Sequence, residues 1–158
     1  MNRPRPFPMS AGPLPPGSDV LPFLRLLWAI DHGMQKRSKR MAVELGVTGM
    51  QRLVIRVLGQ YPRLSLSELA SMLHLHASTV TGVVQRLQKS GFVVRKIDPL
   101  DRRRFRVALT RKGRAIDAQG GKTVESAVQK ALSVLPPGDI EAAMRVLTEI
   151  GHQLSARA

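Results

Sequence analysis

From Val20 to Met34, apolar residues recur at the three- and four-residue spacing of an amphipathic helix. This first helix is predicted to begin at Ser18 or Asp19, because either side chain can cap it. It is predicted to end near Leu45, since Gly46 favours termination. Its apolar positions are Val20, Phe23, Leu24, Leu27, Trp28, Ile30 and Met34.

Two shorter helices are predicted next. Thr48 begins the second helix and the Tyr61-Pro62 pair ends it. Ser65 and Glu68 have the S-x-x-E spacing of a capping box, which predicts a third helix through Leu73. The buried stripe of the second helix is expected to be Leu53, Val54, Val57 and Leu58.

After a fourth predicted helix, the apolar pattern changes to the alternation typical of strands. The helix covers about Ala77 to Lys89 and ends before Gly91. Residues 92–97 and 105–109 then alternate, with a turn at 98–103 between them, which predicts a β-hairpin. The inward face of the helix is expected to be Val80, Val83, Val84 and Leu87.

The remainder of the chain is predicted to be helical. Thr110 caps a fifth helix, which Gly120-Gly121 interrupts or weakens, and Pro136-Pro137 precedes a last amphipathic helix. Two short helices in sequence, followed by a hairpin, are the element order of a winged helix-turn-helix. The predicted fold class is therefore mainly α with a small β-hairpin wing.

Charge adds the first indication of a partner. The chain has 158 residues and a formal net charge of +14, which attracts polyanions. Double-stranded DNA is the favoured partner, with an anionic membrane or a merely soluble basic protein as alternatives. Residues 1–17 hold six of the 11 prolines and are predicted to form a flexible tail. With no signal peptide and no long apolar run, a cytoplasmic location without membrane insertion is expected.

The fourth helix has the chemistry of a recognition helix. In a helix-turn-helix, the second helix lies in the major groove. Hydroxyl groups suit phosphates, whereas Gln and Arg can contact base edges. An ordinary amphipathic surface helix is the alternative for this segment alone. The predicted DNA-facing residues are Ser78, Thr79, Thr81, Gln85 and Arg86.

The hairpin favours the DNA-binding interpretation. Residues 86–114 hold eleven Lys or Arg, opposed only by Asp98 and Asp101, which are interpreted as structural. A solvated loop needs no such clustering, whereas binding to phosphates does. The wing residues predicted to contact DNA are Arg102, Arg103 and Arg104.

Several segments resemble the MarR (multiple antibiotic resistance regulator) family of transcriptional regulators. The stretch from Asp98 to Gly113, with Asp101-Arg102-Arg103, Val107 and Leu109-Thr110 in register, is similar to the family's wing signature. Residues 65–70, 78–81 and 91–95 resemble its third helix, its recognition helix and its entry to the wing. The resemblance extends over about residues 20–155.

The resemblance implies roles for residues and segments. Arg103 would be the wing-tip residue that enters the minor groove, supported by Asp101. Residues 18–46 and 111–158 would form a helical dimerisation region of a homodimer, beside a DNA-binding lobe at 47–110. The chain departs from the family pattern at Gly82, which removes one possible contact, and at His74 and His76 in the turn between the third and fourth helices.

The family often holds a small aromatic or anionic effector between the dimer helices and the DNA-binding lobe. The residues predicted to line such a pocket are Trp28, His32, Met50 and Gln51, although a core position is the alternative for Trp28. The chain has no Cys, which excludes disulfides and thiolate metal sites. No catalytic motif, metal site or cofactor is predicted.

The predicted function is thus that of a dimeric regulator, a repressor on a pseudo-palindromic operator, released by such an effector. The first alternative is an architectural DNA-binding protein of low specificity, which the net charge also suits. A basic scaffold for an acidic protein or membrane is the second.

Overall fold

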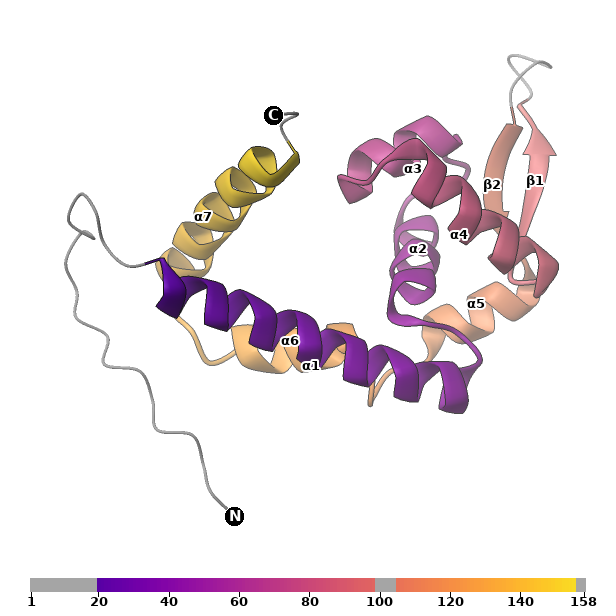
Figure 1. Cartoon of the computed structure of the whole chain (residues 1–158). Coiled ribbons are helices and arrows are strands. Elements are labelled where there is room, and N and C mark those ends of the chain that lie inside the picture. Colours follow the sequence, from indigo (N-terminus) through magenta and orange to yellow (C-terminus); the bar gives the residue numbers. More distant parts are fainter. Residues whose placement is uncertain (1–19, 99–104, 156–158) are drawn as a thin grey trace.

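A computed structural model describes residues 20–98 and 105–155 (Figure 1). Outside the described residues lie the predicted tail 1–17, the predicted caps Ser18 and Asp19, and the wing residues Asp101, Arg102, Arg103 and Arg104. The helices are α1 (Leu21–Leu45), α2 (Gly49–Gln60), α3 (Leu66–Leu73), α4 (Ala77–Lys89), α5 (Arg111–Ala118), α6 (Val124–Leu132) and α7 (Pro137–Ser155). The strands are β1 (Val93–Ile97) and β2 (Phe105–Leu109).

Local sequence signals set the ends of the first three helices. Val20 occupies the N-cap position of α1, where its side chain offers no acceptor, and Gly46 ends the helix at φ +70°. The predicted capping box at α3 is confirmed: the Ser65 N–H donates to Glu68, and the Glu68 N–H donates to the Ser65 hydroxyl. A second capping box, between Thr48 and Gln51, begins α2.

The helices α2 to α5 and the hairpin enclose one core (Figure 1). The predicted stripe of α2 is wrong at Leu53, whose exposed fraction is 45%. Ile55 is fully buried instead, and so is the charged Arg52. Leu53 is turned away from this core because it lines a cavity between α1, α2 and α6. The most deeply buried core residues are Val54, Ile55, Leu69, Val80, Val84, Leu87 and Val107.

The hairpin is antiparallel and is attached to the lobe along β2. Val93 pairs with Leu109 at the end next to α5, and Ile97 pairs with Phe105 at the far end. The Val107 N–H donates to the Leu64 carbonyl at 2.7 Å, so the segment before α3 continues the ladder for one bridge. The hairpin is thereby held to the lobe at its root, while Ile97 and Phe105 remain exposed.

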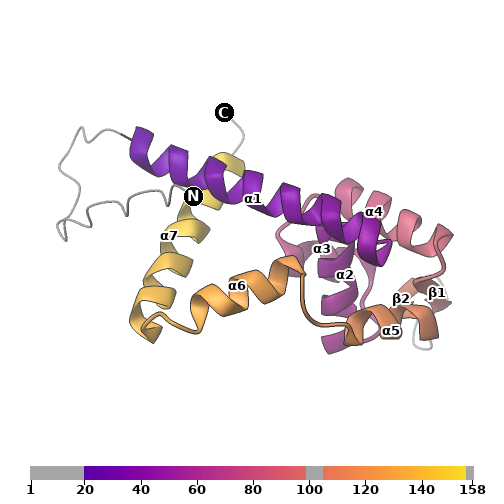
Figure 2. The same ribbon diagram turned by 90° about the horizontal axis from the view of Figure 1, so that it is seen from below.

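The helices α1, α6 and α7 extend to one side of this lobe, with α7 at the end away from the hairpin (Figure 1, Figure 2). The predicted interruption of the fifth helix is confirmed, because α5 and α6 are separate helices and Gly121 lies between them at φ +89°. Within the described residues, no helix is long and apolar enough to cross a membrane.

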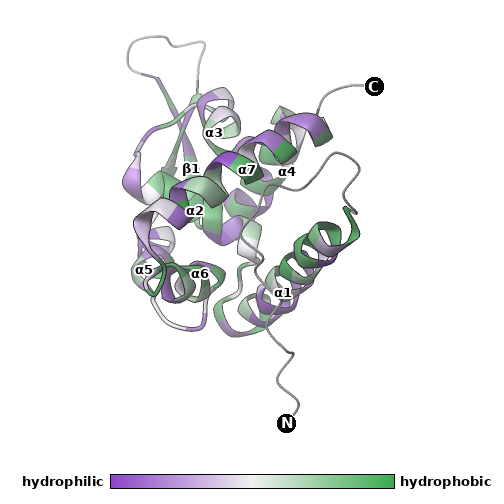
Figure 3. Ribbon diagram, turned by 90° about the vertical axis from the view of Figure 1, so that its left-hand side faces the viewer, coloured by the Kyte–Doolittle hydropathy of each residue, from purple (hydrophilic) through white to green (hydrophobic). Residues whose placement is uncertain are grey.

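These outer helices keep apolar side chains exposed. Among the described residues, none in α6 or α7 is buried, and Met41 is the buried residue of α1. Figure 3 shows hydrophobic positions along α1, where Trp28 is 66% exposed. The large apolar side chains exposed on these helices include Leu21, Phe23, Leu26, Trp28, Ile30, Leu132, Met144, Leu147 and Leu154.

Candidate nucleic-acid interface

Two histidines form the turn between α3 and α4. His74 ends α3 in the left-handed conformation at φ +51°. His76 is the N-cap of α4, and its Nδ1 accepts a hydrogen bond from the Ser78 N–H at 3.3 Å. His76 therefore supplies the acceptor that Ser or Asp usually provides at this position. The turn keeps its capping although both residues depart from the family pattern.

The two faces of α4 are divided as the sequence predicts. Val80, Val83, Val84 and Leu87 are buried against the core. The opposite face presents Ser78, Thr79, Gln85 and Arg86 to solvent, with Thr81 half-buried. A Cβ atom at Gly82 would lie 3.6 Å from Arg86 Nη1, so the Arg86 guanidinium lies close to the space left by the glycine. The structure thus brings these polar residues together on one exposed helix face.

Cations of the hairpin region differ in where they point. Lys112 donates to the Ser90 carbonyl at 2.9 Å and Arg114 to the Leu109 carbonyl at 3.0 Å. Arg106 turns toward the lobe and pairs with the buried Asp98 at 2.5 Å. The hydrogen bond from Asp98 raises the pKa of Arg106 above its ordinary value. These three cations are bound within the protein, whereas Lys96 is exposed.

Arg52 is a buried charge that the sequence analysis missed. Its guanidinium donates to the carbonyls of Ile116 and of Gln119, the latter at 2.5 Å, and thus caps the end of α5. Its Nε also lies 2.5 Å from Glu125 in the first turn of α6. The spacing of Arg52, Ile55 and Leu58 could have revealed it, because it places the arginine in line with buried positions.

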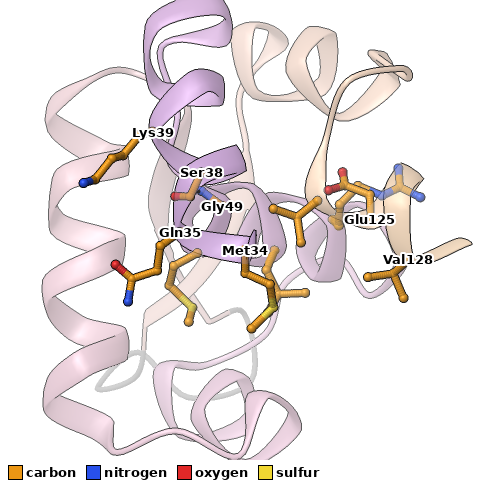
Figure 4. A pocket seen from close by; sticks show the side chains of 11 residues that line it. Met34, Gln35, Ser38, Lys39, Gly49, Glu125 and Val128 are labelled. Atoms are coloured by element: carbon orange, nitrogen blue, oxygen red, sulfur yellow. Dashed lines mark hydrogen bonds between the residues drawn. The ribbon is translucent and has the colours of Figure 1, made fainter. Parts of the chain in front are cut away.

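A cavity of about 670 Å³ lies between α1, α2 and α6 (Figure 4). Of the four residues predicted for an effector pocket, Met50 lines this cavity. Trp28 and His32 are not among its lining residues, and the Gln51 side chain caps α2. The sequence analysis did not anticipate the rest of the lining, which is Met34, Gln35, Ser38, Lys39, Gly49, Leu53, Arg56, Val124, Glu125 and Val128.

The cavity is apolar with a few charged groups at its edge. Partial burial alone would raise the pKa of the Glu125 carboxyl, but the hydrogen bond from Arg52 helps to hold that pKa below its ordinary value. Glu125 is therefore ionised and already paired at neutral pH, while Arg56 pairs with Asp117 at 2.7 Å. Within the described residues, no three His, Asp or Glu side chains come together to hold a metal ion.

The exposed polar face of α4, the capped turn before it and the adjoining hairpin define a winged helix-turn-helix, a class of DNA-binding protein. The model of the MarR family matches residues 47–105 of this chain. Over this segment the chain is similar to the MarR family of DNA-binding transcriptional regulators.

Two curated relatives are named as transcriptional regulators. The organic hydroperoxide resistance transcriptional regulator of Bacillus subtilis (strain 168) is 28% identical over 100 residues, which are 60% of this chain and 68% of that protein. The HTH-type transcriptional regulator TtmR of Methylorubrum extorquens (strain PA1) is 33% identical over 90 residues, 57% of this chain and 46% of the relative. The chain thus spans less than half the length of TtmR.

A solved structure shows the same fold. The S. aureus MepR-DNA complex superposes with a TM-score of 0.68 at 21% identity, covering 84% of this chain and 98% of that one. The superposition covers a larger part of this chain than the segment that the family model matches.

Proposed function

We propose that this regulator is a dimeric, sequence-specific repressor that binds a pseudo-palindromic operator. The observation that carries the proposal is the exposed polar face of α4 beside a hairpin whose far end, at Ile97 and Phe105, is also exposed. In Figure 1 the two elements lie side by side, and α1, α6 and α7 are on another side of the lobe. A duplex could therefore meet α4 and the hairpin together.

The roles of individual residues follow from their chemistry. We assign phosphate contacts to the hydroxyls of Ser78, Thr79 and Thr81, and base contacts to Gln85 and Arg86. The wing would add Arg103 in the minor groove, supported by Asp101, with Arg102 and Arg104 near phosphates. Exposure of the four α4 residues other than Thr81 supports the first part of this assignment.

The exposed apolar side chains of α1, α6 and α7 support a homodimer. A single chain leaves large side chains such as Trp28, Met144 and Leu154 in water, with exposed fractions of 66%, 65% and 79%. Burying these side chains against a second copy would be favourable, because apolar surface is removed from water. We therefore assign 18–46 and 111–158 to dimerisation and 47–110 to DNA binding. A dimer on a promoter would repress by occupying it.

Selection of bound genomic fragments tests the proposal directly. We expect recovered sites to contain two half-sites about one helical turn apart, occupied by two chains. We expect Arg103→Ala to weaken operator binding about tenfold or more, and Gln85→Ala or Arg86→Ala to reduce discrimination between operator and mutated operator. Titrations at a fixed salt concentration would measure both effects.

The architectural alternative has a different outcome in the same experiment. Equal protection of operator and random DNA would favour a low-specificity protein and contradict the proposal. Wild-type affinity in Arg103→Ala would contradict the role of the wing, and retardation of DNA by a monomer would contradict the dimer.

The cavity supports regulation by a small aromatic or anionic effector. Its size suits such a ligand, its walls are mostly apolar, and Lys39 adds a cation at the edge. Because it lies between α1 and α6 on one side and α2 on the other, a ligand there would touch both proposed regions.

A cavity-filling variant tests the effector proposal. Leu53→Trp should occupy the cavity, since the Leu53 side chain lines it and is 45% exposed. We expect phenolic carboxylates to raise the melting temperature of the wild-type protein and to release its operator, and to do neither in Leu53→Trp. Equal responses of the two proteins would place the ligand elsewhere, and no response in either would remove the effector from the proposed function.

A further inference from the structure

Arg106 lies near the far end of the paired strands, where it is bonded to the residue that follows the opposite strand. It belongs to β2, and Asp98 directly follows β1. Arg106 Nε donates to Asp98 Oδ2 at 2.5 Å, and the Asp98 side chain is only 3% exposed. A carboxylate this buried requires a partner, so the contact is a fixed part of the hairpin.

The same guanidinium also reaches the helix-turn-helix. Arg106 Nη1 donates to the Arg63 carbonyl at 2.9 Å, and Arg63 is held in the left-handed region at φ +66°. Nη1 also lies 3.7 Å from Glu68 Oε2. Glu68 is the acceptor of the α3 capping box, where its Oε2 accepts from the Ser65 N–H at 2.7 Å. Arg106 thus connects the wing to the N-terminus of α3.

These contacts explain why arginine occupies this position. A planar guanidinium can donate in several fixed directions at once, which a lysine ammonium on a flexible chain does not reproduce. Asp98 and Glu68 together offset the Arg106 charge within the protein. The pKa of Glu68 is lowered, first by the Ser65 hydrogen bonds and also by Arg106, which agrees with an ionised cluster at neutral pH.

We propose that Arg106 is a positioning residue for operator binding, which sets the angle between the wing and α3–α4 without contacting DNA. Its guanidinium contacts Asp98, the Arg63 carbonyl and Glu68. The inference rests on the proposed function, because it requires that wing and α4 meet one duplex. The role proposed for Arg106 therefore differs from that of Arg102 and Arg104, which are assigned to phosphate contacts.

Three substitutions distinguish positioning from a phosphate contact. Arg106→Gln removes the charge of Arg106 and would lower the salt slope if Arg106 touched a phosphate. Arg106→Lys keeps the charge but loses the planar donor arrangement. Lys96→Gln removes a charge from the residue directly opposite Arg106 on β1, which is exposed and serves as the matched control. We measure operator affinity over a series of salt concentrations, since each phosphate contact that is lost lowers the slope of log K against log salt by about 0.9.

We expect Arg106→Lys to lose about tenfold in operator affinity at every salt concentration, with the slope unchanged, because the number of phosphate contacts is unchanged. Lys96→Gln should lose less affinity at moderate salt. Near wild-type affinity in Arg106→Lys would overturn the inference, as would a slope reduced by one contact in Arg106→Gln. Circular dichroism and melting curves establish that each variant is folded; if Arg106→Gln unfolds, Arg106→Lys alone decides.

Failure of the proposed function gives a different pattern. If the wild-type protein shows no preference for any operator, the proposed sequence-specific function is wrong. If Arg103→Ala binds like wild type, the proposed role of the wing is wrong. If wild type and Arg103→Ala behave as proposed and Arg106→Lys binds normally, then the inference on Arg106 alone is wrong.

Discussion

Replacing Arg52 by Met should lower the free energy of unfolding by about 1–3 kcal/mol, the cost of leaving buried hydrogen-bond acceptors without their donor. The Arg52 side chain is 3% exposed, and its donors serve α5 carbonyls as well as Glu125. Met has a similar length and fills the space of the Arg52 side chain. The decrease in the free energy of unfolding would therefore come from the missing charge and the missing hydrogen-bond donors. The Glu125 carboxylate and the carbonyls of Ile116 and Gln119 would remain without this donor.

Arg56 provides a matched control one helical turn further along α2. It also reaches α5, through the Asp117 carboxylate at 2.7 Å, but its side chain is 50% exposed. Because solvent screens such a pair, Arg56→Met should cost less than about 1 kcal/mol. Urea denaturation at one fixed chain concentration measures both variants, since association would otherwise shift the apparent stability. Losses of equal size would show that burial of Arg52 contributes nothing special.

The Arg52–Glu125 pair also predicts the sign of a pH dependence. The folded pKa of Glu125 is depressed, so its contribution to stability is present above the pKa of the unfolded chain. That contribution is lost as the pH falls through the folded pKa. The stability of Arg52→Met should therefore decrease less on acidification than that of the wild-type protein.

Replacing Gly113 by Ala should destabilise the lobe by about 1–3 kcal/mol, the usual cost of overpacking. A Cβ atom at Gly113 would collide with the Phe92 carbonyl oxygen, and a backbone atom cannot yield as a flexible side chain can. That carbonyl also accepts the Thr110 N–H at 3.0 Å, at the junction between β2 and α5. The methyl group would force α5 away from the start of β1.

Gly120→Ala is the control for this substitution, because no atom lies within 4 Å of the added Cβ and its φ is not left-handed. We expect a change within about 0.5 kcal/mol for it, as for most surface substitutions. Operator affinity of Gly113→Ala should also fall, because the displaced junction carries the hairpin. Wild-type melting behaviour in Gly113→Ala would mean that α5 does not approach the strand so closely.

The sequence predicted most element boundaries because their causes are local. Gly46 ends α1, Ser65 and Glu68 cap α3, and Gly120-Gly121 separates two helices, all through interactions within a few residues. The two faces of α4 also follow from spacing alone. Its exposed polar residues were therefore identified before any contact between distant segments was known.

The features that were missed depend on such distant contacts. Arg52 finds its partners more than sixty residues further along the chain, and the cavity draws its walls from three helices. Arg106 was counted among the wing cations because composition does not reveal that Asp98 and the Arg63 carbonyl face it. Leu53 was placed in the core because helical spacing does not say which of two apolar faces meets the lobe.

The contacts of Arg52 restrict insertions and deletions in the connection between α5 and α6. Ile116, Asp117 and Gln119 precede the Gly120-Gly121 pair and Glu125 follows it, yet one guanidinium holds both sides. Surface connections usually tolerate insertions and deletions, because longer loops cost little entropy. Here the number of residues from 119 to 125 is limited by the reach of a single side chain, so this connection should resist such changes.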